Sequence, residues 1–327
     1  MGDETLSDIQ KAISNVARKR DCDVLFYNGD LERPHDDKVI EEVLNREPRR
    51  KNVILVLCTY GGDPNAAYRI AKCLQSHYKK FTVAVAGFCK SAGTLIVCGA
   101  NSLILLENAE LGPLDIQLRK SDELEEFSSG LTPTQAITTL GTRSIATFTQ
   151  AFLEMKRELL LTTKTAAEIA SKLAVGLYQP IMEQLDPMRI GEMDRAVSIV
   201  SAYGERLMRK GKNVKDGALS RLVVGYPSHS FVIDREEAKE LFKVVEDPVD
   251  DELDFYRHLE LLGRRPLDKK GSPYIFFMDE PEDADDSQQP SSNKDSGEQG
   301  DPGASSSGGQ QAGPPDPPTD GSNDRPS

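Results

Sequence analysis

The stretch that decides the fold is residues 53–74, which read VILVLCTYGGDPNAAYRIAKCL. Residues 53–58 form an unbroken apolar run rich in β-branched side chains, and such a run predicts a strand that is covered on both faces. Gly61 and Gly62 then interrupt the chain, and residues 65–77 follow a helical period. The order of strand, glycine turn and helix is typical of a βαβ unit in a parallel sheet.

Further units of the same kind lie on either side of this stretch. Apolar runs predict strands over residues 23–27, 81–86 and 103–106, and helical spacing predicts helices over residues 5–20, 36–46 and 91–100. Longer helices are predicted over 147–161, 166–184 and 191–210, with a break at Asp186-Pro187. A final strand, turn and helix is expected over 230–242. The fold class is therefore α/β, with an added helical segment.

Charge and composition separate the C-terminal tail from the rest. From Asp279 to the end, twelve acidic residues stand against two basic ones, so this tail carries −10 of the net charge of −13. The tail is also rich in Pro, Gly and Ser, which predicts disorder over residues 279–327. Because the remainder is close to neutral, we expect no nucleic-acid or membrane partner.

The five cysteines show no CxxC spacing and lie largely in apolar runs, which favours buried free thiols in a reducing compartment. The first residues resemble neither a secretory signal nor a myristoylation site, and no apolar run reaches the roughly 18 residues that a membrane span needs. We therefore expect a cytoplasmic protein. Metal-ligand spacings and phosphate-binding motifs are missing from the sequence, so no metal or cofactor is predicted.

Residues with catalytic potential follow two consecutive predicted strands. The first delivers Gly61-Gly62, whose bare backbone amides suit an oxyanion hole. The second delivers GFCKSAGT, residues 87–94, and places Ser91 at the first turn of an apolar helix, where developing negative charge is favoured. A double glycine alone is most often an ordinary turn, and a serine before a helix is most often an N-cap. Together, at consecutive strand ends, they predict a nucleophile and its hole.

Several motifs, in order, resemble the ClpP/SppA-like serine peptidases of the crotonase fold. TYGGDPNAAYRIA, GFCKSAGT, ELGPLDIQ, DPMRIGEMDRA and YPSHSFVIDREEA resemble in particular the serine dehydrogenase proteinase family. The resemblance covers roughly residues 20–250. It implies stacked ββα units, Ser91 as nucleophile, and the amides of Gly61 and Gly62 as the oxyanion hole. The corresponding division of the chain is an N-terminal helix over 1–20, a peptidase domain over 21–265 and the tail.

The base that activates Ser91 departs from the family's usual order. No histidine stands near Leu114-Asp115, where ClpP-like enzymes place theirs, and His229 stands where they carry the acid. We therefore predict His229 as base and Asp115 as its orienting acid, since triads reach one geometry through several chain orders. The alternative is a lysine base. Lys164 is the best such candidate, because Lys120 and Lys156 lie in polar surroundings, and Lys90 directly precedes Ser91, where neighbouring side chains point apart.

The predicted function is a cytoplasmic serine endopeptidase that hydrolyses peptide bonds of a peptide or protein substrate through an acyl-enzyme. The resemblance also implies assembly into a homo-oligomer that encloses the sites. Two other functions remain open: a crotonase-like enzyme that acts on an acyl thioester, and a catalytically silent scaffold of the same fold.

Overall fold

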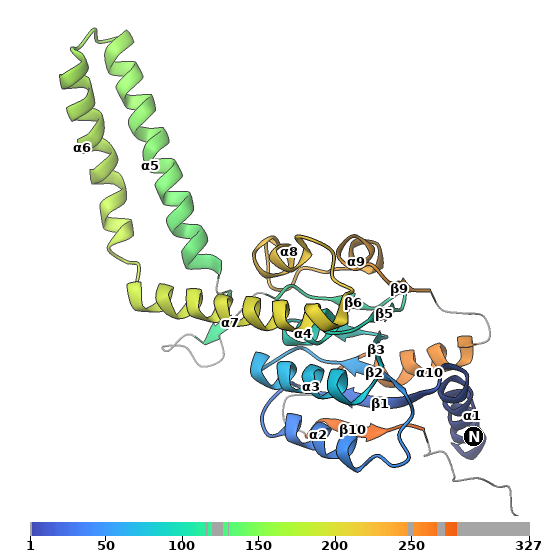
Figure 1. The fold of residues 1–327 in the computed structure, drawn as a ribbon. Helices are drawn as coiled ribbons and strands as arrows, with labels where there is room; N and C mark the ends of the chain where they lie inside the picture. Colours follow the sequence, from blue (N-terminus) through green and yellow to red (C-terminus); the bar gives the residue numbers. More distant parts are fainter. Residues whose placement is uncertain are drawn as a thin grey trace, which may run out of the picture. The chain divides into compact units, whose positions relative to one another are not determined.

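The computed structural model describes residues 2–114, 117–119, 127–129, 131–247, 252–266 and 272–279. A six-stranded sheet in the order β10-β1-β2-β3-β5-β9 forms the centre of this part (Figure 1). The strands β1 (Cys22–Asn28), β2 (Asn52–Cys58), β3 (Lys80–Val85), β5 (Ser102–Leu105) and β9 (Val245–Glu246) run parallel to one another. The predicted α/β class is therefore confirmed.

The four predicted strands of this sheet lie where the apolar runs placed them. Every residue of β1 and β5 is buried, and in β2 and β3 only the first residue is not. Burial on both faces requires helices on both sides, because apolar side chains alternate between the two faces of a strand. The helices α2 (His35–Asn45), α3 (Pro64–His77) and α4 (Ala92–Cys98) connect these strands in turn.

Two neighbouring residues of β2 show how the helices are divided between the faces. A Cβ at Gly93 of α4 would lie 3.9 Å from Leu57 Cδ2, and one at Gly263 of α10 (Leu253–Gly263) would lie 4.0 Å from Val56 Cγ1. Because adjacent strand residues point to opposite faces, α4 and α10 cover opposite sides of the sheet. The helix α1 (Gly2–Arg20) packs on α10, as Figure 1 shows.

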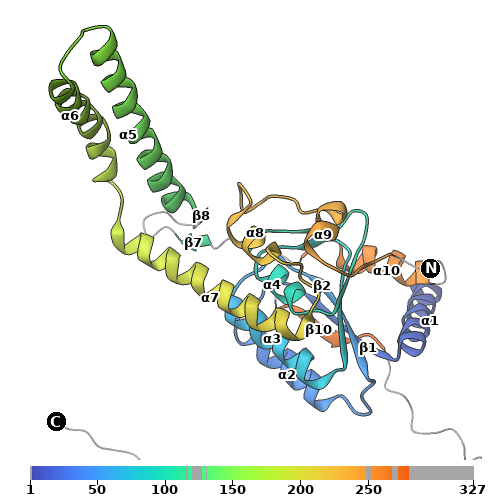
Figure 2. The same cartoon turned by 45° about the horizontal axis from the view of Figure 1, so that its top comes forward.

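The added helical segment consists of α5 (Leu131–Arg157), α6 (Thr163–Met182) and α7 (Pro187–Gly211). Helices α5 and α6 lie side by side (Figures 1 and 2). The predicted break before α7 is confirmed, because the Asp186 side chain accepts a hydrogen bond from the Met188 amide and Pro187 opens the helix. Helix α5 begins earlier than the predicted residue 147. Its threonines are accommodated because hydroxyls such as that of Thr142 bond back to a carbonyl one turn earlier.

Short elements complete the described part of the chain. The strands β4 (Phe88–Cys89) and β6 (Glu110–Leu111) pair in parallel, and β7 (Gln117–Arg119) and β8 (Phe127–Ser129) pair antiparallel. The helices α8 (Ala218–Val224) and α9 (Arg235–Leu241) follow α7. The strand expected at the start of residues 230–242 is reduced to one isolated antiparallel pair between Leu111 and Ile233.

The C-terminal boundary differs from the prediction. Residue 265 does not end the folded part, because β10 (Tyr274–Phe277) pairs antiparallel with β1 at the edge of the sheet. Asp279, assigned to the tail, is buried. It accepts hydrogen bonds from the Val24 amide (2.8 Å) and from Arg46 (2.6 Å). A buried carboxylate needs such partners, and here they fix the end of the strand. The predicted disorder over residues 280–327 lies outside the described residues.

Candidate active site

The glycine turn after β2 lies beside the segment that carries Ser91. The Thr59 amide donates to the Phe88 carbonyl (2.8 Å), and the Lys90 amide donates to the Thr59 carbonyl (3.0 Å). These two bonds extend the parallel arrangement of β2 past its end, and they bring Gly61 next to Ser91. A Cβ at Gly61 would lie 2.8 Å from the Ser91 Cβ. The two predicted features are therefore neighbours in the structure.

Both glycines adopt backbone conformations that L side chains rarely take. Gly61 has a φ of 110° and Gly62 a φ of 135°. A Cβ at Gly62 would lie 2.2 Å from the Leu31 carbonyl oxygen, because the backbone of Leu31 runs directly against this turn. The double glycine is thus required both by its φ angles and by the close approach of two backbones.

Ser91 itself has a φ of 48° and a ψ of −118°, which is a sparsely populated region for a residue with a Cβ. It sits at the sharp turn between β4 and α4, and its side chain makes no capping hydrogen bond to that helix. Ser91 therefore holds the N-cap position of α4 but lacks the side-chain hydrogen bond of an ordinary N-cap serine. A strained backbone at a strand-to-helix turn is also found at the nucleophile elbows of hydrolases.

The backbone amides around Ser91 differ in their use. The Gly61 amide donates to Thr59 Oγ1 at 2.9 Å. The Leu31 amide donates to the Gly61 carbonyl, and the Asp63 amide donates to the Leu31 carbonyl. The Gly62 amide lies between these two bonds and has no hydrogen-bond partner within the described ranges. Ala92, the first residue of α4, also offers an amide without an intrahelical partner, because the first N–H groups of any helix have none.

Small residues and a threonine seat α4 behind the nucleophile. Gly93 faces Thr59 so closely that a Cβ there would lie 2.6 Å from Thr59 Cγ2. The hydroxyl of Thr94 donates to the Gly112 carbonyl at 2.7 Å, which ties the helix to the loop after β6. Burial raises the pKa of the Cys89 thiol well above its ordinary value, so Cys89 is a core thiol, as the sequence suggested, and not a rival nucleophile.

The segments that carry the predicted base and acid approach this site. The amide and carbonyl of Leu111, in β6, both bond to Ile233 (2.9 and 3.1 Å), four residues after His229. His229 is half-buried. The Leu114 amide bonds to α8, but Asp115 lies outside the described residues, so its predicted role is not placed.

The lysine candidates have different surroundings. Lys164 is exposed in the first turn of α6, so the burial that would make a lysine an effective base is absent there. Lys90 is largely buried, and its ammonium contacts Glu110 Oε1 at 3.0 Å. The sequence did not single out this ion pair or Thr59. The local signals were two sequence positions: Lys90 directly precedes Ser91, and Thr59 directly follows β2.

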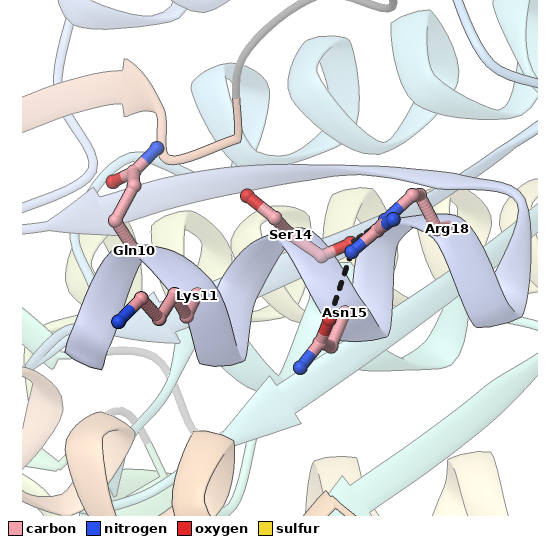
Figure 3. Close-up of a pocket in the computed structure, with 5 residues that line it drawn as sticks. All are labelled: Gln10, Lys11, Ser14, Asn15 and Arg18. Carbon is pink, nitrogen blue, oxygen red and sulfur yellow. Dashed lines mark hydrogen bonds between the residues drawn. The ribbon is translucent and has the colours of Figure 1, made fainter. Parts of the chain in front are cut away.

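A hollow on the surface of α1 does not resemble an active site. It has a volume of about 460 Å³ and is lined by Gln10, Lys11, Ser14, Asn15 and Arg18 (Figure 3). All five side chains come from one helix, and Arg18 donates a hydrogen bond to Asn15 (2.9 Å). Such a shallow polar surface lacks the convergent groups of a ligand site.

In the described ranges, no helix has both the length and the apolarity that a membrane crossing needs.

The parallel sheet with its covering helices belongs to the α/β class of folds, and the glycine turn and Ser91 lie at neighbouring strand ends of it. Within that class, residues 33–125 match the sequence model of the ClpP-like SDH-type serine proteinases. This range contains Gly61, Gly62 and Ser91. The resemblance to the serine dehydrogenase proteinase family that the motifs indicated is therefore confirmed for the segment that carries the predicted nucleophile.

Two uncharacterized proteins of Methanocaldococcus jannaschii are similar to part of this chain. The first is 40% identical over 83 residues, which are 25% of this chain and 29% of that protein. The second is 32% identical over 83 residues, which are 25% of this chain and 28% of that protein. The match thus spans less than a third of the length of either relative.

Two solved structures of one protease are also similar. A serine-to-alanine mutant of the 1510-N membrane-bound stomatin-specific protease has a TM-score of 0.30 and 15% identity, over 45% of this chain and 68% of that one. A lysine-to-alanine mutant in complex with a substrate peptide has a TM-score of 0.31 and 17% identity, over 46% and 64%. TM-scores this low carry no argument about substrate or base.

Proposed function

We propose that this protein is a serine peptidase that cleaves peptide bonds through an acyl-enzyme on Ser91. The observation that carries the proposal is the strained backbone of Ser91, with a φ of 48°, packed against Gly61. A chain retains such strain where the surrounding structure enforces it, and a strained serine at a strand-to-helix turn is the arrangement that exposes a nucleophile. The match of residues 33–125 to serine proteinases supports the same chemistry.

The oxyanion hole in this proposal is built from the Gly61-Gly62 turn. Since the Gly61 amide donates to Thr59, the Gly62 amide is the donor that this turn offers to a developing oxyanion, and Ala92 supplies the second amide. Gly61 contributes by allowing the close approach to Ser91. Two prearranged donors in such a hole commonly account for a factor of roughly 100 to 1,000 each in rate.

His229 is the proposed base and Asp115 its orienting acid. Support comes from the pairing of Leu111 with Ile233, which holds the segment after His229 next to the strand that leads into residues 112–115. In the first step the base takes the Ser91 proton while Oγ attacks the substrate carbonyl, and the amine leaves with that proton. Water, activated by the same base, then releases the acid and frees Ser91. A base from Lys164 is the competing proposal, and its exposure in α6 weighs against it.

A fluorophosphonate probe tests the nucleophile directly. The wild type should be labelled once per chain, with the label mapped to Ser91 by peptide mass, and Ser91→Ala should not be labelled. Ser198→Ala is the matched control, because Ser198 is an exposed serine that only bonds back to the Asp194 carbonyl within α7. Absence of labelling in a folded wild type would contradict the proposal and favour a silent scaffold. Labelling without hydrolysis of any peptide substrate would favour an enzyme that acts on another acyl group.

The same variants separate the two candidate bases. His229→Ala should reduce labelling by at least about 100-fold, as expected for loss of a general base, and Lys164→Ala should leave the rate unchanged. The reverse result would assign the base to the lysine. Endopeptidase action is proposed on the same grounds, and cleavage of internal bonds in an unfolded protein substrate tests it by mass spectrometry.

A cytoplasmic location and a homo-oligomeric state are further parts of the proposal. All five cysteines are free and buried, which suits a reducing compartment. The helix α6 exposes apolar side chains at a spacing of four residues, namely Ile169, Leu173, Leu177 and Ile181. A second copy of the α5–α6 hairpin would cover this row, because an apolar face of that length is typical of a protein interface. Cell fractionation tests the cytoplasmic location. Light scattering tests the homo-oligomer, since Leu173→Glu should lower the particle mass relative to the wild type.

A further inference from the structure

The side chain of Lys90, directly before the nucleophile, makes three polar contacts to residues from other segments. Its Nζ lies 3.0 Å from Glu110 Oε1, 3.2 Å from the Leu111 carbonyl oxygen and 3.5 Å from the Phe231 carbonyl oxygen. The ammonium group, which has N–H donors and no acceptor, donates hydrogen bonds to the two carbonyl oxygens, and its contact with Glu110 is an ion pair. With only 12% of the side chain exposed, little of this charge is left to water.

The aliphatic stem of Lys90 is closely packed against Gly112. A Cβ at Gly112 would lie 2.6 Å from Lys90 Cδ and 3.1 Å from Lys90 Cα, so the lysine stem lies directly over that glycine. The Gly112 amide in turn donates to the Cys89 carbonyl at 3.1 Å. Stem and backbone together fix the course of the loop after β6 relative to the turn that carries Ser91.

These contacts connect three segments that the proposed mechanism requires. Lys90 is covalently next to Ser91, and it bonds β6 through Glu110 and Leu111. Its contact with the Phe231 carbonyl reaches the segment of His229, two residues away. The other described tie between this segment and β6 is the Leu111–Ile233 pair, which lies four residues from His229. Of these two described contacts, that of Lys90 lies nearer to His229 along the chain.

We propose that Lys90 is a positioning residue, which clamps the His229 segment and the loop after β6 to the Ser91 turn and takes no proton itself. This inference rests on the proposed function for its catalytic consequence, but the clamp is a structural claim of its own. Because misplacing a catalytic group by about 1 Å costs on the order of 100-fold in rate, loss of the clamp should act on the chemical step.

The experiment compares Lys90→Met, which keeps an unbranched stem of similar length without the charge, with Lys90→Arg, which keeps the charge and several donors. Lys239→Met is the matched control, since Lys239 forms an exposed ion pair with Glu236 (2.8 Å) on α9. Hydrogen exchange of residues 228–233 is measured first. Exchange there should quicken at least about tenfold in Lys90→Met, with little change in Lys90→Arg and none in Lys239→Met. Unchanged exchange in Lys90→Met would overturn the clamp, whether or not the protein is a peptidase.

Labelling and peptide hydrolysis then test the consequence of the clamp for catalysis. Lys90→Met should lose about 10- to 100-fold in labelling rate and in kcat, with KM within a factor of about two, and Lys90→Arg should recover most of it. A Lys90→Arg variant as inactive as Lys90→Met, with normal exchange in both, would show that the amine acts chemically and would overturn the inference. If the wild type itself is not labelled, the proposed function fails, and the exchange result still decides the clamp.

Discussion

The strain at Ser91 can be measured without any substrate, by comparing Ser91→Gly with Ser91→Ala. Both variants lack the hydroxyl, but alanine keeps the Cβ that makes a φ of 48° with a ψ of −118° unfavourable. Glycine adopts positive φ without that penalty. The difference in stability between the two variants therefore reports the backbone strain, reduced by the greater freedom of glycine in the unfolded chain.

The magnitude follows from two opposing contributions. A residue held in a sparsely populated backbone region costs about 1–3 kcal/mol, which glycine recovers. Glycine also gains freedom in the unfolded chain, which lowers stability by about 0.5–1 kcal/mol relative to alanine. The difference in unfolding free energy should therefore favour Ser91→Gly over Ser91→Ala by about 0–2.5 kcal/mol. At roughly 2–4 °C per kcal/mol for a domain of this size, Tm should be higher by up to roughly 10 °C.

Chemical unfolding followed by circular dichroism measures this difference, with thermal melting as a second readout. The control is the same pair at Ser198, an exposed position inside α7 with ordinary helical surroundings. There the sign should reverse, and glycine should be less stable than alanine by about 1 kcal/mol. If Ser91→Gly proves less stable than Ser91→Ala by about 0.5–1 kcal/mol, as at an unstrained position, Ser91 is not strained, and the observation that carries the proposed function is lost.

Three further predictions concern the glycine turn, a buried carboxylate and the thiols. Gly61→Ala should lower the labelling rate of Ser91 by at least about 100-fold, because the new Cβ would lie 2.8 Å from that of Ser91 and displace it; labelling at the wild-type rate would contradict the close approach. Burial acts to raise the pKa of Glu246, but hydrogen bonds from Ser102 and two basic side chains outweigh it and lower the pKa from 4.5 to about 2. Glu246 thus stabilises the fold above pH 4.5, and this contribution is lost as the pH falls towards 2. Glu246→Gln should lower the free energy of unfolding by about 1–2 kcal/mol at pH 7. Unfolding curves should show the difference between the variant and the wild type shrinking between pH 4.5 and pH 2. Burial raises the pKa of all five thiols, so a thiol reagent should react with none of them in the folded protein and with five after denaturation; fast reaction of a native thiol would show that the core is open.

The sequence by itself determined the central strands and the two features at their ends. Short, β-branched apolar runs such as residues 53–58 are typical of strands buried on both faces, and the neighbouring Gly61-Gly62 and Ser91 are local signals that need no distant partner to be recognised. The cap of α7 at Asp186-Pro187 was readable for the same reason, since a capping side chain bonds its own helix.

Only the tertiary structure decided features that depend on residues far apart in the chain. The apolar run of residues 274–277 is a local strand signal, but only the pairing of β10 with β1, about 250 residues earlier, shows that it belongs to the sheet and that residue 265 is too early an end. The use of the Gly61 amide by Thr59, the three partners of Lys90 and the positive φ of Ser91 likewise follow from how β2, β4 and β6 pack together. A sequence pattern specifies which residues are apolar or flexible, whereas the partner of a polar group is set by which segments the fold brings within hydrogen-bonding distance.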